Sequence, residues 1–481
     1  MNHRTTRSRA AGTAIALSLL VMATACGQKP GTHLATGGGT ATTFAAGDGS
    51  GGGASPGLAA GDGSTTGGAT ATGVGGDATT GGSAASGTTG GGAATTGGTA
   101  TGAALKITGK DRTGVSADTI TLAVHAPVTG AAPLPSESFQ RSSDLYWRYL
   151  TEVKGEKVLG RSHVKVEFKD DKYTPNTAIQ ACRELSASSF MLAGAGGTDQ
   201  IQACAQFADK THVPYFSPGV TEVGLTGLKD YFATGMSYPK QAVLLAQYVK
   251  KSFPGKKVAA IITNTPNFDD AATAWDAAVK QQGLSYFKTL RHPKGNNSWI
   301  TTYASEMKGA GVQVLFFLSS PSDYIQFAQQ AGTQGFHPQY VGVGISKGLN
   351  AVLEAGCPDV NGGIFFSPFP GLDWARKNLP EFFAAGQRFG VPTDDIALAL
   401  WGLASVEDEA FKRYEQVFKS TDLTREDFVK MLETQTGIAT KSNPQLSFSP
   451  TNHFGATQVH VLKADCATGE HTTLATFVSG F

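Results

Sequence analysis

The chain has 481 residues and a formal net charge of +1 at pH 7, from 39 basic and 38 acidic residues. A near-neutral chain without a block of Lys and Arg interleaved with aromatic residues argues against nucleic acid as a partner. Beyond a low-complexity N-terminal part, the chain is long enough for two domain cores.

The N-terminus is typical of an export signal. Arg4, Arg7 and Arg9 precede an uncharged run over residues 10–25, which is shorter than the roughly 20 apolar residues that span a bilayer. Small residues then lead directly to Cys26, as in a lipobox. We therefore predict a lipoprotein signal peptide at residues 1–25 and a lipid anchor on Cys26, at the extracytoplasmic face of the plasma membrane. The alternative is an ordinary secretory signal followed by an unmodified cysteine.

Residues 26–114 are predicted to form the lipidated cysteine and a disordered tether. From residue 31 to 104 the sequence is almost wholly Gly, Ala, Thr and Ser, which cannot bury enough apolar surface to offset the entropy of ordering. Such a tether would hold the remainder roughly 50 Å from its anchor. The glycines keep no three-residue period, which excludes a collagen helix.

From about residue 115 onward, short β-branched and aromatic runs alternate with amphipathic stretches. This pattern is typical of parallel sheets with crossover helices, in two successive sets. The expected strands are 120–126, 164–170, 190–194 and 213–217, then 258–263, 286–290, 312–319 and 340–343. The expected helices include one whose face carries Phe139, Ser142, Tyr146 and Tyr149, one that begins after Thr174, and others near 269–282, 299–307 and 322–331.

Four cysteines follow Cys26: Cys182, Cys204, Cys357 and Cys466. An even number in an exported chain indicates disulfides, although the sequence alone permits three pairings. Buried free thiols are the alternative for either pair. No Cys-x-x-Cys motif or Cys/His cluster indicates a metal, and we expect no cofactor.

Four segments of the body resemble the type I periplasmic binding proteins, in particular the leucine/isoleucine/valine-binding family of ABC importers. They are residues 120–130, 166–178, 213–221 and 258–270, and Val213-Pro-Tyr-Phe-Ser-Pro-Gly-Val-Thr221 is the most specific of them. The resemblance covers about residues 115–475. It implies an α/β fold class, with two Rossmann-like lobes built on parallel sheets and joined by a three-stranded hinge.

The same resemblance implies three crossings between lobes, near residues 231–236, 365–370 and 444–449. Lobe I would comprise 115–233 plus 368–444, and lobe II 236–365 plus 446–481. Each of the pairs Cys182–Cys204 and Cys357–Cys466 would then lie inside one lobe. We favour this pairing because a disulfide between lobes would lock the hinge.

A ligand is expected between the lobes, beyond the carboxyl ends of the strands. Backbone N–H groups and small hydroxyls at helix N-termini can hold a carboxylate, and two loops after predicted strands offer them. The resemblance assigns the ligand's carboxylate and amino group to these loops, although ordinary turns have the same composition. The implied residues are Thr129, Gly197, Thr198, Ser217, Gly219 and Thr221.

On lobe II the resemblance implies contacts from Phe268, Ser319 and Ser320. Gly344 departs from it, because amino-acid binders have a glutamate there against the ligand's ammonium. A carboxylate or amide without an ammonium is therefore at least as well supported as an amino acid, unless Asp323 or Glu137 supplies the acid. Trp401 matches an aromatic residue that can face the cleft, although an aromatic on a helix more often lies in the core.

The resulting hypothesis is the substrate-binding component of an ABC importer that carries no catalytic residues. It would capture a small polar solute, such as a branched-chain amino acid or a related carboxylate or amide, and deliver it as a monomer to a membrane permease. A ligand sensor with the same fold is an alternative. Another is a secreted serine hydrolase, because Ser346 lies in a Gly-x-Ser-x-Gly motif followed by Asp373, Asp394 and His453, although no oxyanion loop accompanies it.

Overall fold

The computed structural model describes residues 104–481 apart from 131–135, 345–347 and 435. The predicted signal peptide, Cys26, Ser346 and nearly all of the tether lie outside the described residues. All described residues belong to one compact unit. Among them, no helix combines the length and the apolar character needed to cross a membrane.

The first sheet contains five strands in the order β2-β1-β3-β4-β5, and all neighbours are parallel. Its central strands are apolar and almost wholly buried, as expected where helices cover both faces of a parallel sheet. The predicted strands are confirmed, with β3 and β4 shorter than expected. The bounds are β1 Thr119–Ala126, β2 His163–Asp170, β3 Leu192–Gly194, β4 Tyr215–Ser217 and β5 Tyr231–Ala233.

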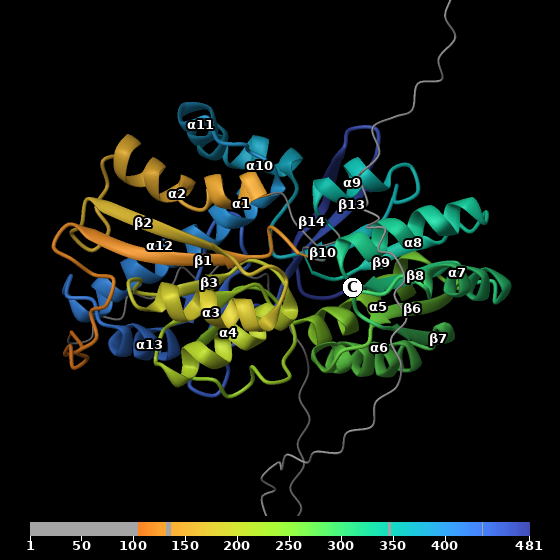
Figure 1. Cartoon of the computed structure of the whole chain (residues 1–481), viewed down its shortest axis with the longest axis horizontal. Helices are drawn as coiled ribbons and strands as arrows, with labels where there is room; N and C mark the ends of the chain where they lie inside the picture. Colours follow the sequence, from red (N-terminus) through yellow and green to blue (C-terminus); the bar gives the residue numbers. More distant parts are fainter. Residues whose placement is uncertain (1–103, 131–135, 345–347, 435) are drawn as a thin grey trace, which may run out of the picture. The chain divides into compact units, whose positions relative to one another are not determined.

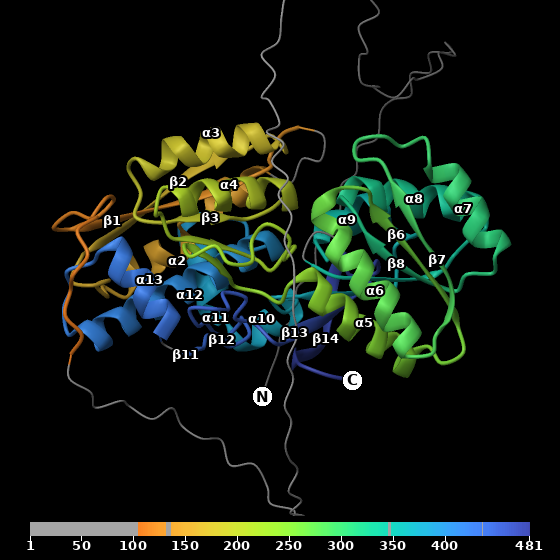
Figure 2. The same ribbon diagram turned by 90° about the horizontal axis from the view of Figure 1, so that it is seen from below.

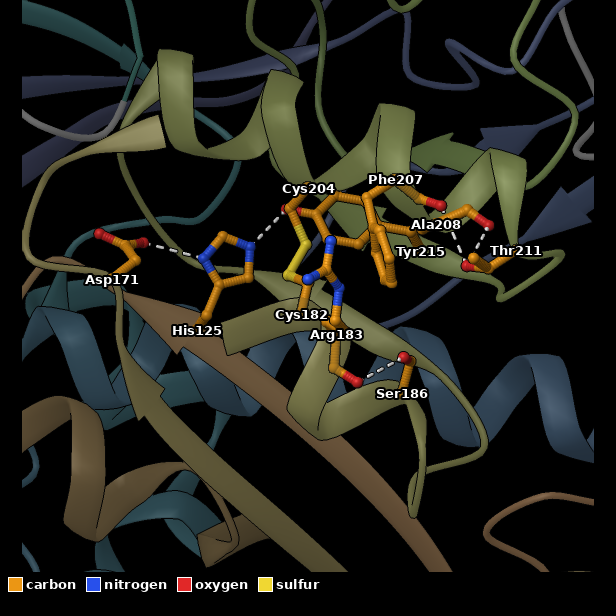
Figure 3. Close-up of a disulfide and its surroundings, with 10 residues drawn as sticks. All are labelled: His125, Asp171, Cys182, Arg183, Ser186, Cys204, Phe207, Ala208, Thr211 and Tyr215. Atoms are coloured by element: carbon orange, nitrogen blue, oxygen red, sulfur yellow. Dashed lines mark hydrogen bonds and ion pairs between the residues drawn. A yellow bond between two sulfur atoms is a disulfide. The ribbon is translucent and has the colours of Figure 1, made fainter. Parts of the chain in front are cut away.

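Helices α3 (Pro175–Ser186) and α4 (Thr198–Lys210) follow β2 and β3. The predicted cap of α3 is confirmed, because Thr177 N donates to the side chain of Thr174 over 3.4 Å and Pro175 occupies the first helical turn. The buried face of α3 includes Cys182, which forms a disulfide with Cys204 of α4. Figure 3 shows this bond between the two helices.

The second sheet repeats the strand order of the first and adds an antiparallel hairpin. Strands β7-β6-β8-β9-β10 are parallel, and β13 and β14 extend the sheet beyond β10 in antiparallel pairing. Figure 1 shows each sheet with its own set of helices. The bounds are β6 Lys257–Thr263, β7 Ser285–His292, β8 Val314–Leu318, β9 Gln339–Gly342, β10 Ile364–Ser367, β13 Val459–Asp465 and β14 Glu470–Val478.

The helices of the second sheet follow the predicted crossover pattern, and a 3-10 turn, Pro266–Phe268, precedes α6. The second predicted disulfide, Cys357–Cys466, is also present and joins the end of α9 to the β13–β14 turn. Figure 2, turned from the view of Figure 1, shows α5 to α9 around this sheet. The bounds are α5 Tyr238–Ser252, α6 Asp269–Gln281, α7 Ile300–Gly309, α8 Pro321–Thr333 and α9 Asn350–Gly356.

The remaining elements join the first sheet and its surroundings. The helical face predicted around Phe139 is divided into α1, α2 and a π-helical turn, and α12 is the longest helix described. The bounds are α1 Ser136–Ser142, α2 Leu145–Arg148, the π-turn Tyr149–Val153, α10 Leu372–Asn378, α11 Pro380–Phe389, α12 Asp395–Phe418, α13 Arg425–Thr434, β11 Thr436–Ile438 and β12 Leu446–Ser447.

Strand pairing locates the crossings between the two sheets. The chain passes from β5 into α5 and returns after β10, and we propose the first two crossings at these points. Strand β12 pairs with β11, and Phe454 forms a bridge with Ala233 of β5. This bridge supports a last crossing after Phe454 as an alternative to residues 444–449. Helix α10 also contacts β14, because Gly371 N donates to Thr473 Oγ1 over 2.8 Å. The lobe boundaries remain a proposal.

Candidate functional site

A cavity of about 100 Å³ lies at the carboxyl ends of strands from both sheets. In each sheet the strand order reverses beside the first strand, at β1/β3 and at β6/β8, which is where open α/β sheets bind ligands. The residues after β1 and β3 form one wall (Pro127 and Gly194 to Thr198), and those after β6 and β8 form the other (Phe268 and Ser319 to Pro321). The two reversal points therefore face one cavity.

Small residues are required where the first sheet lines the cavity. A Cβ on Gly194 would lie 2.0 Å from the Tyr215 hydroxyl oxygen, and one on Gly219 would lie 2.2 Å from the carbonyl oxygen of Gly235. Gly197 has a φ of +77° and immediately precedes α4. These glycines let two loops approach the cavity through their backbones.

The first turn of α4 directs free backbone donors at the cavity. Among the described residues, none accepts a hydrogen bond from the N–H groups of Gly197 or Thr198. Such groups, with the helix dipole, favour an anion. The Thr198 side chain is hydrogen-bonded to Tyr238, and burial raises the pKa of Tyr238 to about 12. The Tyr238 hydroxyl therefore stays protonated at neutral pH and can act as a donor.

The hydroxyls of the second wall are already used within the protein. Ser319 Oγ accepts from Thr263 Oγ1 over 2.7 Å and donates to Asp323 Oδ2 over 2.5 Å. Ser320 caps α8 and accepts from Asp323 N over 3.1 Å. Phe268 stacks on Tyr238 with ring centroids 6.1 Å apart. This wall therefore offers mainly an aromatic surface and the N-terminus of α8.

Gly344 is closed in by α5. Its N–H donates to Gln241 Oε1 over 3.0 Å, and a Cβ on it would lie 2.5 Å from the Tyr238 ring. Its φ of +78° also disfavours any side chain. The aromatic ring of Tyr238 thus occupies the space that an acid at this position would need.

The end of the cavity that α12 lines is mostly apolar, with Asn443 as a polar residue beside that helix. Helix α12 contributes residues at helical spacing to this end, and α1 and the segment after β10 complete it. Among the lining residues of the described chain, none is an Asp, Glu, Lys, Arg or His. The apolar members are Phe139, Leu349, Phe369, Ile396, Ala399, Leu400 and Leu403.

The cavity brings together most of the predicted ligand-binding residues: Gly197, Thr198, Gly219, Phe268, Ser319, Ser320 and Gly344 line it. Four do not. Exposed Thr129 donates to Asp170, Ser217 is bonded to the Tyr231 hydroxyl and to Pro218 O, and Thr221 donates to Asp270. Trp401 is 3% exposed and packs on Tyr146, Tyr149 and Phe382.

Several lining residues were not singled out in the sequence, namely Tyr173, Met236, Tyr238, Gln241 and the four from α12. The spacing of Ile396, Leu400 and Leu403 shows a helical apolar face. It does not distinguish a face against the cavity from one against the core. Tyr238 and Gln241 follow the first crossing, and their role depends on the contact with Gly344, which is remote in sequence.

Two groups of contacts link the walls beside the cavity. Asp270 of α6 accepts from Thr221 Oγ1 over 2.9 Å and from the N–H of Glu222 over 2.6 Å. Asp199 of α4 is paired with Lys294 over 2.5 Å and accepts from Asn267. Both groups join an element of the first sheet to one of the second, so the structure is a closed arrangement.

A buried network lies behind the first wall. His125 Nδ1 is 2.8 Å from Asp171 Oδ2, and its Nε2 is 2.7 Å from the Tyr215 hydroxyl. Figure 3 shows the imidazole between these partners and beside the disulfide. Within the described chain, potential metal-ligand atoms lie close together at His125, Cys182 and Cys204. The two sulfurs are bonded to each other, however, and both ring nitrogens of His125 already have hydrogen-bond partners.

The residues weighed as hydrolase partners have structural contacts in separate places. Asp394 caps α12 through Ala397 N over 2.8 Å, and Asp373 accepts from Thr473. His453 stacks on Phe232, and its Nδ1 is 2.9 Å from Tyr231 O. Ser346 lies outside the described residues, so the structure defines no catalytic arrangement around it.

Sequence comparison relates this chain to known binding proteins. A sequence model described as periplasmic binding protein matches residues 119–470. Leu/Ile/Val-binding protein homolog 7 of Brucella suis is 27% identical over 222 residues, which are 43% of this chain and 53% of the relative. Homolog 3 of Brucella melitensis is 24% identical over 204 residues, 41% of this chain and 54% of the relative. The matched stretches thus span about half the length of these curated relatives.

Solved structures match over more of the chain. A fatty acid ABC transporter substrate-binding protein from Thermomonospora curvata has a TM-score of 0.65 at 18% identity, covering 77% of this chain and 95% of its own. A branched chain amino acid ABC transporter protein from Thermus thermophilus with bound valine has a TM-score of 0.62 at 17% identity, covering 76% and 98%. These likenesses confirm the predicted two-lobed α/β fold.

Proposed function

This chain belongs to the family of periplasmic binding proteins, and from that premise we propose that it is the extracytoplasmic solute-binding component of an ABC importer. The observation that carries this proposal is the shared cavity, which is lined by the strand-reversal points of both sheets. A solute in this position would touch both lobes at once. Among the described lining residues there is no His, Asp, Glu or Lys that could act as a base, and the polar groups present there are suited to binding.

Binding by such a site acts through lobe closure. A solute that contacts both walls only when they meet favours the closed arrangement, and the shift in population equals the difference in affinity between the two states. The contacts of Asp270 and Asp199 across the cavity contribute to the closed state. A permease could then distinguish the loaded protein by its closed surface.

The proposed solute is small, with an apolar body and one polar end. The names of similar solved structures include valine, 3,4-dihydroxy benzoic acid and fatty acid as ligands or cargo. Each of these carries a carboxylate. A branched-chain amino acid or a related carboxylate is therefore the class that we propose for this cavity.

The proposal includes the cellular arrangement predicted from the N-terminus. Cys26 would carry the lipid, residues 26–114 would act as the tether, and the body would act as a monomer that delivers solute to a membrane permease. Labelling with a radioactive fatty acid in the native host tests the anchor. Wild-type chain should incorporate label, whereas Cys26→Ser should not; equal labelling of both would contradict the anchor.

A ligand screen by thermal unfolding tests the function. The mature chain with Cys26→Ser would be heated with branched-chain and other amino acids, short and aromatic carboxylates, amides and sugars. A ligand at a hundred times its Kd adds about 2.7 kcal/mol, enough to raise the Tm by several degrees. The proposal fails if no solute in the panel raises the Tm while the same protein hydrolyses an ester through Ser346.

A further inference from the structure

We propose that the ligand of this cavity is a monocarboxylate without an α-ammonium group, with its carboxylate at the N-terminus of α4 and its apolar tail against α12. This inference rests on the proposed solute-binding function and specifies the substrate class for the same cavity. Three features of the lining carry it: the missing acid, the donors at one end and the apolar surface at the other.

The first feature is that the described part of the lining offers no counter-charge for an ammonium. No Asp or Glu is among the described lining residues. Tyr238 fills the space that a side chain at Gly344 would need, and the carboxylate of Asp323 already accepts a hydrogen bond from Ser319. An ammonium held in such a cavity would lose its hydration without gaining an opposite charge, which costs several kcal/mol.

The second feature is a surplus of donors at the α4 end. The free N–H groups of Gly197 and Thr198 meet there. Behind these groups, the side chain of Gln200 is fully buried and neither of its amide atoms has a hydrogen-bond partner. That amide lies against Gly197, where a Cβ would be 2.1 Å from Gln200 Oε1. Gln200 is not among the residues that line the cavity, so a carboxylate at this end would accept from the N–H groups of Gly197 and Thr198.

The field at the cavity also favours an anion. Helices α4 and α8 each span 13 residues, and each directs its N-terminus at the lining, through Thr198 and through Ser320 and Pro321. The positive ends of two helix dipoles thus converge from opposite walls. This arrangement stabilises one negative charge and disfavours a positive one.

The third feature is the apolar end. Ile396, Leu400 and Leu403 from α12 face the cavity together with Phe139 of α1 and Phe369. An alkyl or aryl tail of a few carbons would replace water on these side chains, at roughly 0.8 kcal/mol for each buried CH₂ group. Affinity is therefore expected to rise with tail length until the tail meets the end of the cavity.

Calorimetry with matched ligands tests the inference. The probes are 4-methylpentanoate, its α-amino analogue leucine and its neutral analogue 4-methylpentanamide, each titrated into the mature chain at pH 7.5. The acid is expected to bind at least about 100-fold more tightly than leucine and at least about tenfold more tightly than the amide. Phenylalanine and 3-phenylpropanoate repeat the comparison with an aryl tail.

The outcomes separate this inference from the proposed function. If leucine binds as tightly as the acid or more so, the inference is overturned while the solute-binding function stands. In that case Glu137→Gln would show whether Glu137, whose side chain lies outside the described residues, supplies the acid. If amide and acid bind equally, recognition of the carboxylate is refuted. If neither series binds but another solute raises the Tm, the substrate class is wrong and the function stands.

Variants at the two ends provide matched controls. Ala399→Phe, which points into the cavity, should weaken 4-methylpentanoate at least tenfold, whereas Ser405→Phe on the same helix lies outside the lining and should not. Thr198→Pro, which removes an N–H at the first position of α4, where helices tolerate proline, should weaken the acid several-fold more than the amide. Equal affinities in Ala399→Phe and wild type would contradict the placement of the tail, and an equal loss for acid and amide in Thr198→Pro would contradict the placement of the carboxylate.

Discussion

The two walls of the cavity come from sheets with the same strand order, yet they offer different chemistry. The first wall exposes glycine-rich backbone with free N–H groups, and an apolar face of α12 adjoins it in the lining. The second wall exposes Phe268 and two serines whose hydroxyls already have partners. The first wall is therefore suited to recognising the ligand, and the second to covering it when the lobes close. Shared topology fixes where a site lies, and local sequence decides what each half does.

The two disulfides give the largest expected difference between the lobes. Cys182–Cys204 closes a separation of 22 residues and Cys357–Cys466 one of 109. The chain-entropy relation gives stabilisation of about 3.4 and about 4.8 kcal/mol respectively. Replacing each pair by serine and measuring urea unfolding should show the larger loss for Cys357–Cys466. A larger loss for Cys182–Cys204 would contradict this order.

Opposite responses to pH should follow from buried groups in the two lobes. In α12, burial raises the pKa of Glu407 to about 8 from an ordinary 4.5. Between these values the unfolded carboxyl is ionised and the folded one is protonated, so stability falls as the pH rises through this window. In β14, burial lowers the pKa of His471 to about 3 from 6.5, so stability falls as the pH drops through that window.

Unfolding midpoints between pH 4.5 and 8.5 check both directions. Glu407→Gln should flatten the loss toward pH 8 by an amount on the order of 3 kcal/mol, and His471→Gln should flatten the loss toward pH 4.5. The exposed Glu415→Gln on α12 is the control and should leave the profile unchanged. Profiles of both variants that overlay the wild type would show that these groups do not set the pH dependence.

A smaller effect is expected from the contact between the walls. Asp270→Ala removes the carboxylate that accepts hydrogen bonds from Thr221 Oγ1 and from the Glu222 N–H. These two hydrogen bonds stabilise the closed arrangement. Ligand affinity should fall by about tenfold, the equivalent of one or two hydrogen bonds, with little change in the Tm of the free protein. The neighbouring Asp269→Ala is the control, because Asp269 pairs with Arg291 inside the second lobe. An equal loss of ligand affinity in both variants would contradict the role of Asp270 in stabilising the closed arrangement.

The sequence predicted the fold more fully than the site. Alternating apolar runs located the strands, and the cap at Thr174 located the start of α3, because these signals are local. The position of Gly197, Thr198 and Gly219 at the ligand site could be predicted, because each lies in a glycine-containing turn after a strand. Tyr238 could not be predicted, because its role depends on meeting Gly344, about a hundred residues away. The apolar face of α12 was visible as a pattern, but only tertiary packing decides what it faces.

Two hydroxyl side chains in the segment 213–221 form hydrogen bonds to other residues of the protein and do not line the cavity. Ser217 and Thr221 belong to the most specific matching segment, yet their hydroxyls contact Tyr231 and Asp270. A hydroxyl in a loop after a strand looks the same in sequence whether it serves a ligand or a neighbouring element. The partners that distinguish these cases lie on other elements, so the distinction needs the structure.

The most direct test is a crystal structure of the mature chain with 5-bromopentanoate, located by the anomalous signal of bromine. We predict one bromine peak inside the cavity, in contact with Leu400 or Phe139. The carboxylate should lie within hydrogen-bond distance of the Thr198 N–H. A bromine peak at the Thr198 end, with the carboxylate toward α12, would contradict the assignment of the two ends. A peak outside the cavity, in protein that binds the acid in solution, would contradict the site itself.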